Sequence, residues 1–320
     1  MRLFKLLIVF TLATGLCAWT GDSATDLPAI DSLWDYNNPA KTEAAFRELL
    51  PKAEKSGNRD YYVQLLSQLA RTLSMQNKIT DSHQVLDKAE ALLGKNMPTA
   101  TVRYLLERGR TYNTSEEKEK ARACFMKAFR LSEEKQLDAY SLDAAHMMGI
   151  VEPVEQQMAW HLKALAIAEQ TQDKRLKGWL GPLYNNIGWT YFDNKQYEKA
   201  LTYFKKDLAW RQEIGDAAGG RISKWSVART YRALNKLDKA MKLQREIEGE
   251  CKQQKITDNG YNLEELGELL LLQGKKQQAY AYFAKAHAIL AKDAWLAEHE
   301  PERLKRLQEL GAKAGGKATE

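Results

Sequence analysis

The stretch that decides the fold is residues 181–216, GPLYNNIGWTYFDNKQYEKALTYFKKDLAWRQEIGD. It contains two runs in which apolar residues recur every three or four positions, the spacing of one helix face. The first run carries Tyr184, Ile187, Gly188 and Tyr191, and the second carries Tyr197, Ala200, Leu201, Phe204 and Leu208. A short polar turn at 193–195 separates the two runs. The stretch therefore predicts two antiparallel amphipathic helices joined by a tight turn.

The same pattern recurs on both sides of this stretch as an internal repeat. Each copy has a small residue where the first helix must approach the second closely. The six small residues are Ala70, Gly109, Ala145, Gly188, Ala228 and Gly267. Their successive spacings are 39, 36, 43, 40 and 39 residues. A repeat of this length predicts an array of helix pairs in which each pair packs on its neighbours.

The spacing resembles the tetratricopeptide repeat. That family places a bulky residue at repeat position 4, an apolar one at 7, small ones at 8 and 20, aromatic ones at 11 and 24, and often alanine at 27. Here those positions hold Tyr184, Ile187, Gly188, Ala200, Tyr191, Phe204 and, as a departure, Asp207. The period exceeds the roughly 34 residues of the standard unit. It is similar to the long-period repeats of kinesin light chains and many bacterial relatives.

The resemblance covers about residues 60–290 and implies an all-α fold. We expect a right-handed α-solenoid of about six antiparallel helix pairs within 60–295, with units starting near 63, 102, 138, 181, 221 and 260. Residues 25–59 are expected to supply a leading helix and 296–311 a C-terminal capping helix. Pro301 and Gly311 have the polarity of a helix start and a helix end. Residues 312–320 are expected to be a disordered tail.

The N-terminus is typical of an export signal. Arg2 and Lys5 precede an apolar run, 6–19, which is shorter than the ~20 residues that a transmembrane helix needs. We therefore expect 1–24 to be a signal peptide and the protein to be periplasmic or secreted. An uncleaved N-terminal membrane anchor is the alternative. Cys124 and Cys251, the cysteines outside this segment, are expected to be reduced thiols packed as small apolar groups.

Composition and motifs favour binding over catalysis. Apolar residues make up 44% and charged residues 28%, and the net charge of +6 permits acidic partners without requiring nucleic acid. The sequence contains no P-loop, dinucleotide-binding, nucleophile-elbow or zinc-protease motif. Glu264, Glu265 and Glu268 share one helix face, which we interpret as solvated. We expect no catalytic residue, no metal and no cofactor.

The family resemblance implies a binding face on the first helix of each pair, where repeat positions 2, 5, 6, 9, 12 and 13 line a concave groove. The candidate groove residues are Arg71, Arg110, Asn113, His146, Asn185, Asn186, Trp189, Phe192, Trp225, Arg229 and Arg232. Arginine pairs with carboxylates and stacks on aromatic rings, and asparagine can hold a peptide backbone. Such a groove favours acidic or extended peptides. The alternative is that these arginines pair with carboxylates on adjacent helices.

Three functions remain open at this level, because a fold alone does not decide function. The leading hypothesis is a non-catalytic scaffold that binds a protein or peptide outside the cytoplasm. The second is a structural or assembly factor that associates with itself through the repeat edges. The third, with the least support from the sequence, is an enzyme or a small-molecule receptor.

Overall fold

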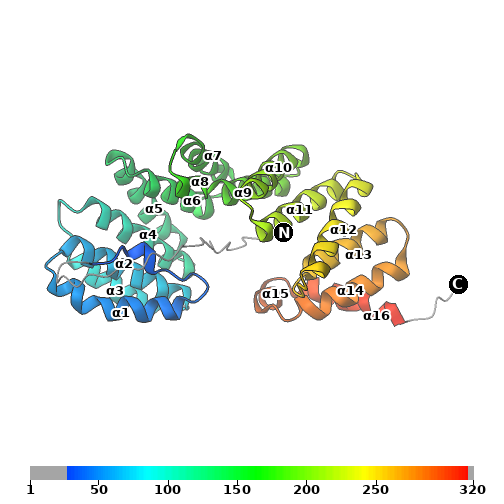
Figure 1. Cartoon of the computed structure of the whole chain (residues 1–320), viewed down its shortest axis with the longest axis horizontal. Helices are drawn as coiled ribbons and strands as arrows, with labels where there is room; N and C mark the ends of the chain where they lie inside the picture. Colours follow the sequence, from blue (N-terminus) through cyan, green and yellow to red (C-terminus); the bar gives the residue numbers. More distant parts are fainter. Residues whose placement is uncertain (1–26, 316–320) are drawn as a thin grey trace. The chain divides into compact units, whose positions relative to one another are not determined.

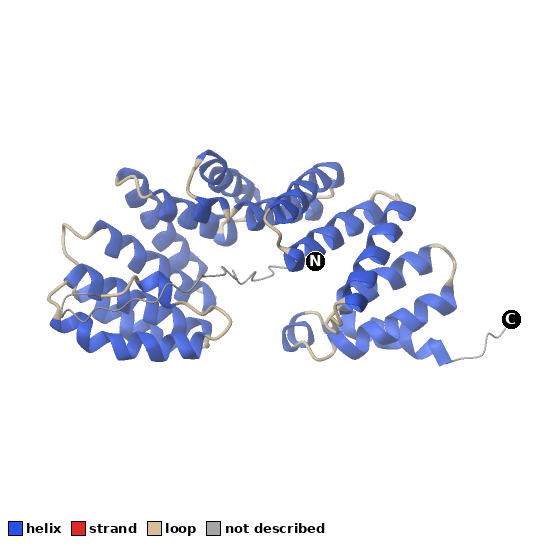
Figure 2. Cartoon of the chain, in the orientation of Figure 1, coloured by secondary structure: helices blue, strands red, loops and turns tan. Residues whose placement is uncertain are grey.

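The computed structural model describes residues 27–315, so the predicted signal peptide at 1–24 lies outside the described residues. Within the described range the chain forms α-helices and short 3-10 helices, without strands (Figure 2). These residues divide into an N-terminal unit, 27–183, and a C-terminal unit, 184–315. Among the helices of this range, none combines the length and the apolar character needed to cross a membrane.

The helices follow one another along the chain in the order labelled in Figure 1. The N-terminal unit contains η1 (Ile30–Leu33), α1 (Pro39–Lys55), α2 (Arg59–Met75), α3 (Ile79–Ala91), α4 (Pro98–Thr114), α5 (Lys118–Glu134), α6 (Asp138–Val151), α7 (Val154–Gln170) and α8 (Lys174–Lys177). Helix α9 (Leu180–Asp193) begins just before the boundary between the units. The C-terminal unit continues with α10 (Tyr197–Glu213), α11 (Ala217–Ala233), α12 (Leu237–Gln253), α13 (Gly260–Leu272), α14 (Lys276–Leu290), α15 (Ala294–His299), α16 (Pro301–Ala312) and η2 (Lys313–Gly315).

Six helix pairs make up most of the chain, which confirms the predicted all-α array of helix pairs. The first helices are α2, α4, α6, α9, α11 and α13, and their partners are α3, α5, α7, α10, α12 and α14. Each first helix carries one of the six small residues recognised in the sequence. A Cβ atom on Gly109, Gly188 or Gly267 would lie 2.5–2.7 Å from the ring of a buried phenylalanine on the partner helix. Glycine is therefore required for this close approach.

The turns inside the pairs also repeat. Five of them place one residue in the left-handed region, with φ between 56° and 75°: Asn77, Glu116, Lys195, Asn235 and Gly274. The amide of the next residue donates to a carbonyl five residues earlier, as Gln196 does to Tyr191 at 2.9 Å. This is the Schellman arrangement that satisfies the last carbonyls of a helix. The third pair differs, because Glu152 is extended before Pro153.

The ends of the array differ in part from the prediction. Helix α1 precedes the first pair and packs on α2, within the 25–59 segment expected to hold a leading helix. The capping helix expected within 296–311 is α16, which begins at Pro301 as the proline indicated, while residues 296–299 belong to the separate short helix α15. Residues 312–315, expected to belong to a disordered tail, instead complete α16 and form η2, whereas 316–320 lie outside the described residues. Both Cys124 and Cys251 are free thiols, and only Cys251 is fully buried.

Candidate functional site

The predicted groove residues all lie on the first helices of the pairs. Arg71 is on α2, Arg110 and Asn113 are on α4, and His146 is on α6. The other seven lie in the C-terminal unit, on α9 and α11: Asn185, Asn186, Trp189, Phe192, Trp225, Arg229 and Arg232. The two groups are described separately, because they belong to different compact units.

In the N-terminal unit the arginines join neighbouring first helices through carboxylates. We call this set the arginine–carboxylate ladder: Arg71, Glu107, Arg110 and Asp143. Glu107 on α4 accepts from Arg110 at 2.9 Å and lies 3.5 Å from Arg71 on α2. Arg110 also pairs with Asp143 on α6. Burial alone would lower the pKa of Arg110, but Asp143 and Glu107 outweigh it and raise that pKa. Burial would likewise raise the pKa of Asp143, which Arg110 and Arg71 instead hold below its usual value.

Sequence reasoning missed two aromatic residues at the start of this ladder. The guanidinium of Arg71 lies 5.4 Å from the ring centres of both Trp34 and Tyr36, in the segment before α1. The Trp34 indole donates to Gln68 at 2.9 Å, and Gln68 donates to Glu107 at 3.0 Å. Neither aromatic belongs to a repeat, so the periodic pattern gave no signal for them. Arg71 and Arg110 are thus already engaged by groups of this unit.

The other two predicted residues of this unit have different surroundings. Asn113 is partly exposed at the end of α4, one turn beyond Arg110. His146 packs edge-on against Trp179, with ring centres 5.1 Å apart. The charge of His146 also helps to lower the pKa of Asp143, so this histidine acts on the same carboxylate as Arg110.

Four predicted residues of the C-terminal unit come together with Tyr261, which the sequence pattern did not predict. We call this set the aromatic–arginine cluster: Trp189, Phe192, Trp225, Arg229 and Tyr261. The ring centres of Trp189 and Phe192 lie 5.1 Å apart, those of Trp189 and Trp225 5.7 Å, and those of Trp225 and Tyr261 5.9 Å. The guanidinium carbon of Arg229 lies 5.3–5.9 Å from the rings of Trp189, Phe192 and Trp225. The cluster therefore surrounds one cation with three aromatic rings.

Two predicted asparagines lie beside this cluster on α9. Asn185 is buried, and its side-chain oxygen accepts from the Trp189 indole at 3.2 Å. Asn186 is partly exposed. The Trp225 indole donates to the backbone oxygen of Tyr261 at 3.1 Å. These hydrogen bonds satisfy both indoles and orient their rings.

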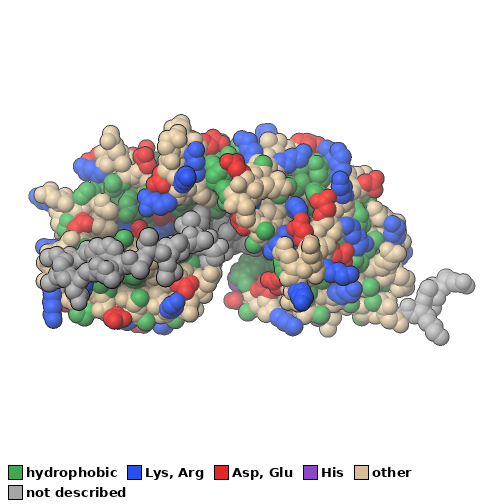
Figure 3. All heavy atoms as spheres, viewed as in Figure 1, with side chains coloured by type: hydrophobic (Ala, Val, Ile, Leu, Met, Phe, Trp, Pro, Cys, Tyr) green, Lys and Arg blue, Asp and Glu red, His purple; other side chains and the backbone are tan. Residues whose placement is uncertain are grey.

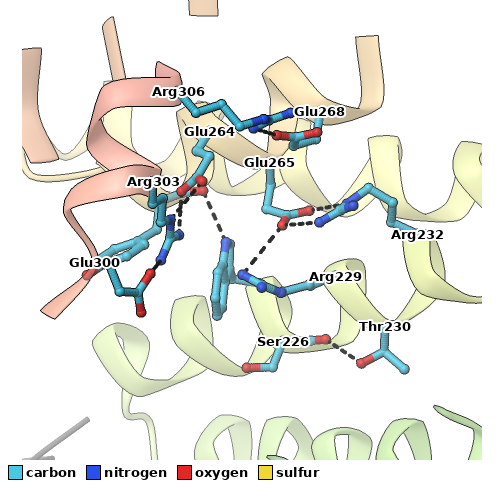
Figure 4. A network of polar contacts seen from close by, with 12 residues as sticks. Ser226, Arg229, Thr230, Arg232, Glu264, Glu265, Glu268, Glu300, Arg303 and Arg306 are labelled. Carbon is cyan, nitrogen blue, oxygen red and sulfur yellow. Dashed lines mark hydrogen bonds and ion pairs between the residues drawn. The ribbon is translucent and has the colours of Figure 1, made fainter. Parts of the chain in front are cut away.

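Glu265 on α13 receives both groove arginines of α11, as Figure 4 shows. Arg232 donates two hydrogen bonds to Glu265, at 2.8 and 2.7 Å. Arg229 lies farther away, with its Nη1 3.8 Å from the carboxylate, and its Nε has no hydrogen-bond partner among the described residues. Burial opposes the charge of Arg232, yet Glu265 raises the pKa of Arg232. Arg229 is therefore the less satisfied of the two cations.

The acidic face of α13 was predicted to be solvated, and this prediction is wrong. Glu264 and Glu265 are buried, and α16 supplies part of the cover (Figure 4). Arg303 donates to Glu264 at 2.8 Å through Nε, and Arg306 pairs with Glu268. Arg303 also pairs with Glu300 at 2.9 Å and lies over the ring of Tyr261 at 5.3 Å. These arginines follow their glutamates by about one repeat period, a signal that the sequence already contained.

Within residues 27–315 no set of three or more His, Cys, Asp or Glu side chains is placed to hold a metal ion. What the geometry offers is a row of partly exposed aromatic rings, one incompletely paired guanidinium and side-chain amides. Such groups bind a ligand by stacking, charge and hydrogen bonding.

Comparisons with known proteins agree with this architecture. A family model described as tetratricopeptide repeat matches residues 102–135 and 181–213, which correspond to the second and fourth helix pairs. No curated protein matches the chain.

Several solved structures share the fold. A signal-transduction ATPase of Pyrococcus horikoshii with a tetratricopeptide-repeat sensor is 19% identical, with a TM-score of 0.64; the alignment covers 85% of this chain but only 44% of that protein. The apo form of RapI is 16% identical over 89% of this chain and 82% of its own, with a TM-score of 0.68. A putative kinesin light chain of Podospora anserina is also 16% identical, covering 62% and 98%, with a TM-score of 0.52.

At these identities the solved structures establish the fold alone, while the family model identifies individual repeats. The two segments that the family model matches are the pairs α4–α5 and α9–α10, each of which has a glycine against a phenylalanine ring. The chain therefore contains tetratricopeptide repeats and shares the fold of tetratricopeptide-repeat arrays.

Proposed function

We propose that this protein is a non-catalytic scaffold that binds an extended segment of another protein along its first helices. The observation that carries the proposal is the aromatic–arginine cluster of the C-terminal unit. Aromatic side chains and arginine are the residues that most often dominate binding energy at protein interfaces. Here Phe192, Trp225 and Arg229 are partly exposed on helices α9 and α11, whereas Trp189 is buried against the rings of Phe192 and Trp225.

Arg229 supports a preference for a segment that contains a carboxylate. Glu265 is the shared carboxylate partner of Arg229 and Arg232, and Arg232 donates a hydrogen bond to each of its two oxygens. The three rings around Arg229 hold the guanidinium without neutralising it. A guanidinium in this position can still pair with a carboxylate of a partner. Apolar side chains next to that carboxylate would contact the partly exposed rings of Phe192 and Trp225.

The arginines of the N-terminal unit support this preference less well. Arg110 is paired with both Glu107 and Asp143, and Arg71 lies between Glu107 and two aromatic rings. We therefore centre the proposed acidic contact on Arg229, whereas the sequence pattern distributed it over the whole groove. We also propose that the protein acts outside the cytoplasm, which rests on the N-terminal sequence pattern alone.

A peptide-display selection against the purified protein tests the proposal. Selected peptides would be synthesised and their affinity measured by fluorescence anisotropy for the wild type, Arg229→Gln and the control Arg221→Gln. Arg221 lies on the same helix and donates to Gln254. Losing one charged hydrogen bond costs about 1.5–3 kcal/mol, so R229Q should bind roughly 10- to 100-fold more weakly. The control should stay within about twofold of the wild type. Equal binding by R229Q and the wild type would refute the assignment to this cluster.

A further inference from the structure

A group of lysines without carboxylate partners lies on a different surface of the C-terminal unit. Four lysines extend over tyrosine rings of helices α9, α10 and α11. We call this set the lysine–tyrosine surface: Tyr184, Tyr191, Lys199, Tyr203, Lys205, Lys206, Tyr231 and Lys239. All four lysines are exposed and all four tyrosines are partly exposed. Figure 3 shows lysine and arginine side chains spread over this part of the unit.

The tyrosine rings lie beneath the amines of these lysines. The Lys206 amine lies 5.3 Å from the ring centre of Tyr203 and 5.5 Å from that of Tyr184. Lys199 lies 5.3 Å from Tyr191, whose ring stacks on Tyr203 with centres 5.6 Å apart. These contacts place two ammonium groups of α10 on one continuous aromatic base.

Tyr231 extends the surface toward α12. Its ring lies 5.6 Å from the Lys205 amine and 5.8 Å from the Lys239 amine, so lysines of two different helices converge on it. Lys205 and Lys206 are consecutive on α10 and reach rings of α11 and α9 respectively, so the two groups of contacts flank one exposed helix. The stems of the lysines cover ring area while their charges face water.

The pairing of these lysines contrasts with that of the groove arginines. Within the described chain, no carboxylate lies within ion-pairing distance of any of the four lysines, and Lys199 instead donates to the neutral Gln196 at 2.9 Å. The neighbouring carboxylate of Glu198 is already paired with Lys236 at 2.8 Å. Four positive charges without carboxylate partners therefore lie over rings of three successive helices, and together they raise the local potential for an anionic partner.

The character of the surface favours a protein partner over a lipid bilayer. Among the described residues, the exposed large apolar side chains are Met75, Val154, Leu162, Ile214, Leu272 and Trp295, and none belongs to the surface. Peripheral membrane binding needs apolar side chains that enter the acyl region in addition to basic charge. Tyrosine hydroxyls and lysine amines are instead donors that suit the side chains of aspartate and glutamate.

We propose that the lysine–tyrosine surface docks an Asp/Glu-rich segment of a partner protein, separately from the groove. The proposal does not depend on the binding of a peptide to the aromatic–arginine cluster. Lysines on flexible stems tolerate variation in the position of carboxylates. Binding therefore depends on the number and spacing of the partner's carboxylates rather than on one fixed geometry, and its affinity decreases as the salt concentration increases.

The experiment compares two variants of equal net charge. The test variant is K199Q/K205Q/K206Q/K239Q, and the control is K242Q/K252Q/K276Q/K305Q, four exposed lysines of the same unit that do not lie over tyrosines. The probe is a fluorescein-labelled peptide of twelve glutamates, measured by anisotropy at low and at physiological salt. A parallel arm measures co-sedimentation with phosphatidylglycerol vesicles. Far-UV circular dichroism establishes that both variants are folded.

The expected result is a loss of about tenfold or more in peptide affinity for the test variant at low salt, against less than about threefold for the control. A similar loss in both variants would overturn the proposal, because net charge alone would then explain binding. Failure of the wild type to bind the peptide would also overturn it. Binding to the vesicles without binding to the peptide would assign the surface to a membrane instead. The R229Q variant should bind the glutamate peptide like the wild type, which separates this surface from the groove.

Discussion

Replacing Asp207 by alanine should destabilise the C-terminal unit, although alanine is the residue that the repeat pattern favours at this position. Substitutions toward a family consensus usually stabilise a protein. Asp207 is fully buried on α10. Its carboxylate accepts from Arg211 at 2.9 Å and from the Ser223 hydroxyl of α11 at 2.6 Å. The carboxylate therefore links the second helix of one pair to the first helix of the next.

The magnitude follows from what the substitution leaves behind. Breaking a buried ion pair by removing one partner costs about 3–5 kcal/mol. Two contacts moderate this cost: Arg211 keeps its bond to Asp216 at 2.6 Å, and the Ser223 hydroxyl can still donate to the Gly219 carbonyl at 3.0 Å. We therefore expect a loss of about 2–3 kcal/mol. The double variant D207A/R211L, which removes both charges, should recover part of that loss.

Urea denaturation measures the effect, followed by far-UV circular dichroism and by tryptophan fluorescence. With a denaturant slope of about 2 kcal/mol/M, the expected loss lowers the midpoint by about 1–1.5 M. The two probes should give the same midpoint, since different midpoints would show that the repeat array unfolds in stages. A D207A midpoint equal to or above that of the wild type would refute the reasoning. It would show that the repeat pattern, rather than the buried ion pair, governs this position.

Two further predictions concern acid stability and helix contact. Burial raises the pKa of Glu43, but hydrogen bonds from Lys78, Arg47 and Gln76 outweigh it and lower that pKa from 4.5 to about 2. The contribution of Glu43 to the free energy of unfolding is complete above pH 4.5 and is lost as the pH falls toward 2. Thermal melts of the wild type across this range should show a loss of about 1–2 kcal/mol, and E43Q should not show it. The same pH dependence of the melting temperature in both proteins would contradict the assignment. Gly188→Ala should lower the free energy of unfolding by about 1–3 kcal/mol in urea denaturation, because its Cβ would lie 2.5 Å from the Phe204 ring. The control Gly220→Ala has open space around it and should be neutral or stabilising. An equal change in stability for both variants would show that the contact between Gly188 and Phe204 does not require glycine.

The arrangement of helix pairs could be predicted from the sequence because packing imposes it. Small residues recur where Gly109, Gly188 and Gly267 contact phenylalanine rings, and no larger residue fits there. In the capping segment, Pro301 indicated the start of α16, but the pattern gave no indication of the separate short helix α15 before it. A residue before proline disfavours the helical conformation, and Glu300 has φ −130° and ψ 47°. Proline therefore divides the segment into two helices.

The candidate site could be predicted only in part. The repeat pattern identified which helix faces carry Trp189, Trp225 and Arg229, and the structure brings these three together. It did not reveal which arginines are already paired, because that depends on the side chains of the next repeat. Glu265 serves both Arg229 and Arg232, while the Arg110 guanidinium is shared by two carboxylates. Assigning these ion pairs requires the distances between helices.

The ladder on α4 has a consequence for how such an array can grow. Helix α4 carries both Glu107, which receives Arg71 from the preceding helix, and Arg110, which reaches Asp143 on the following one. If this helix pair were duplicated in tandem, Arg110 of the first copy could pair with the residue equivalent to Glu107 in the second copy. The two copies could therefore pack on each other as successive repeats. Helices α9 and α11 hold Asn186 and Ser226 at the place of that acceptor. Copies of those units would lack the ionic complementarity, which makes α4–α5 the natural module for lengthening the chain by gene duplication.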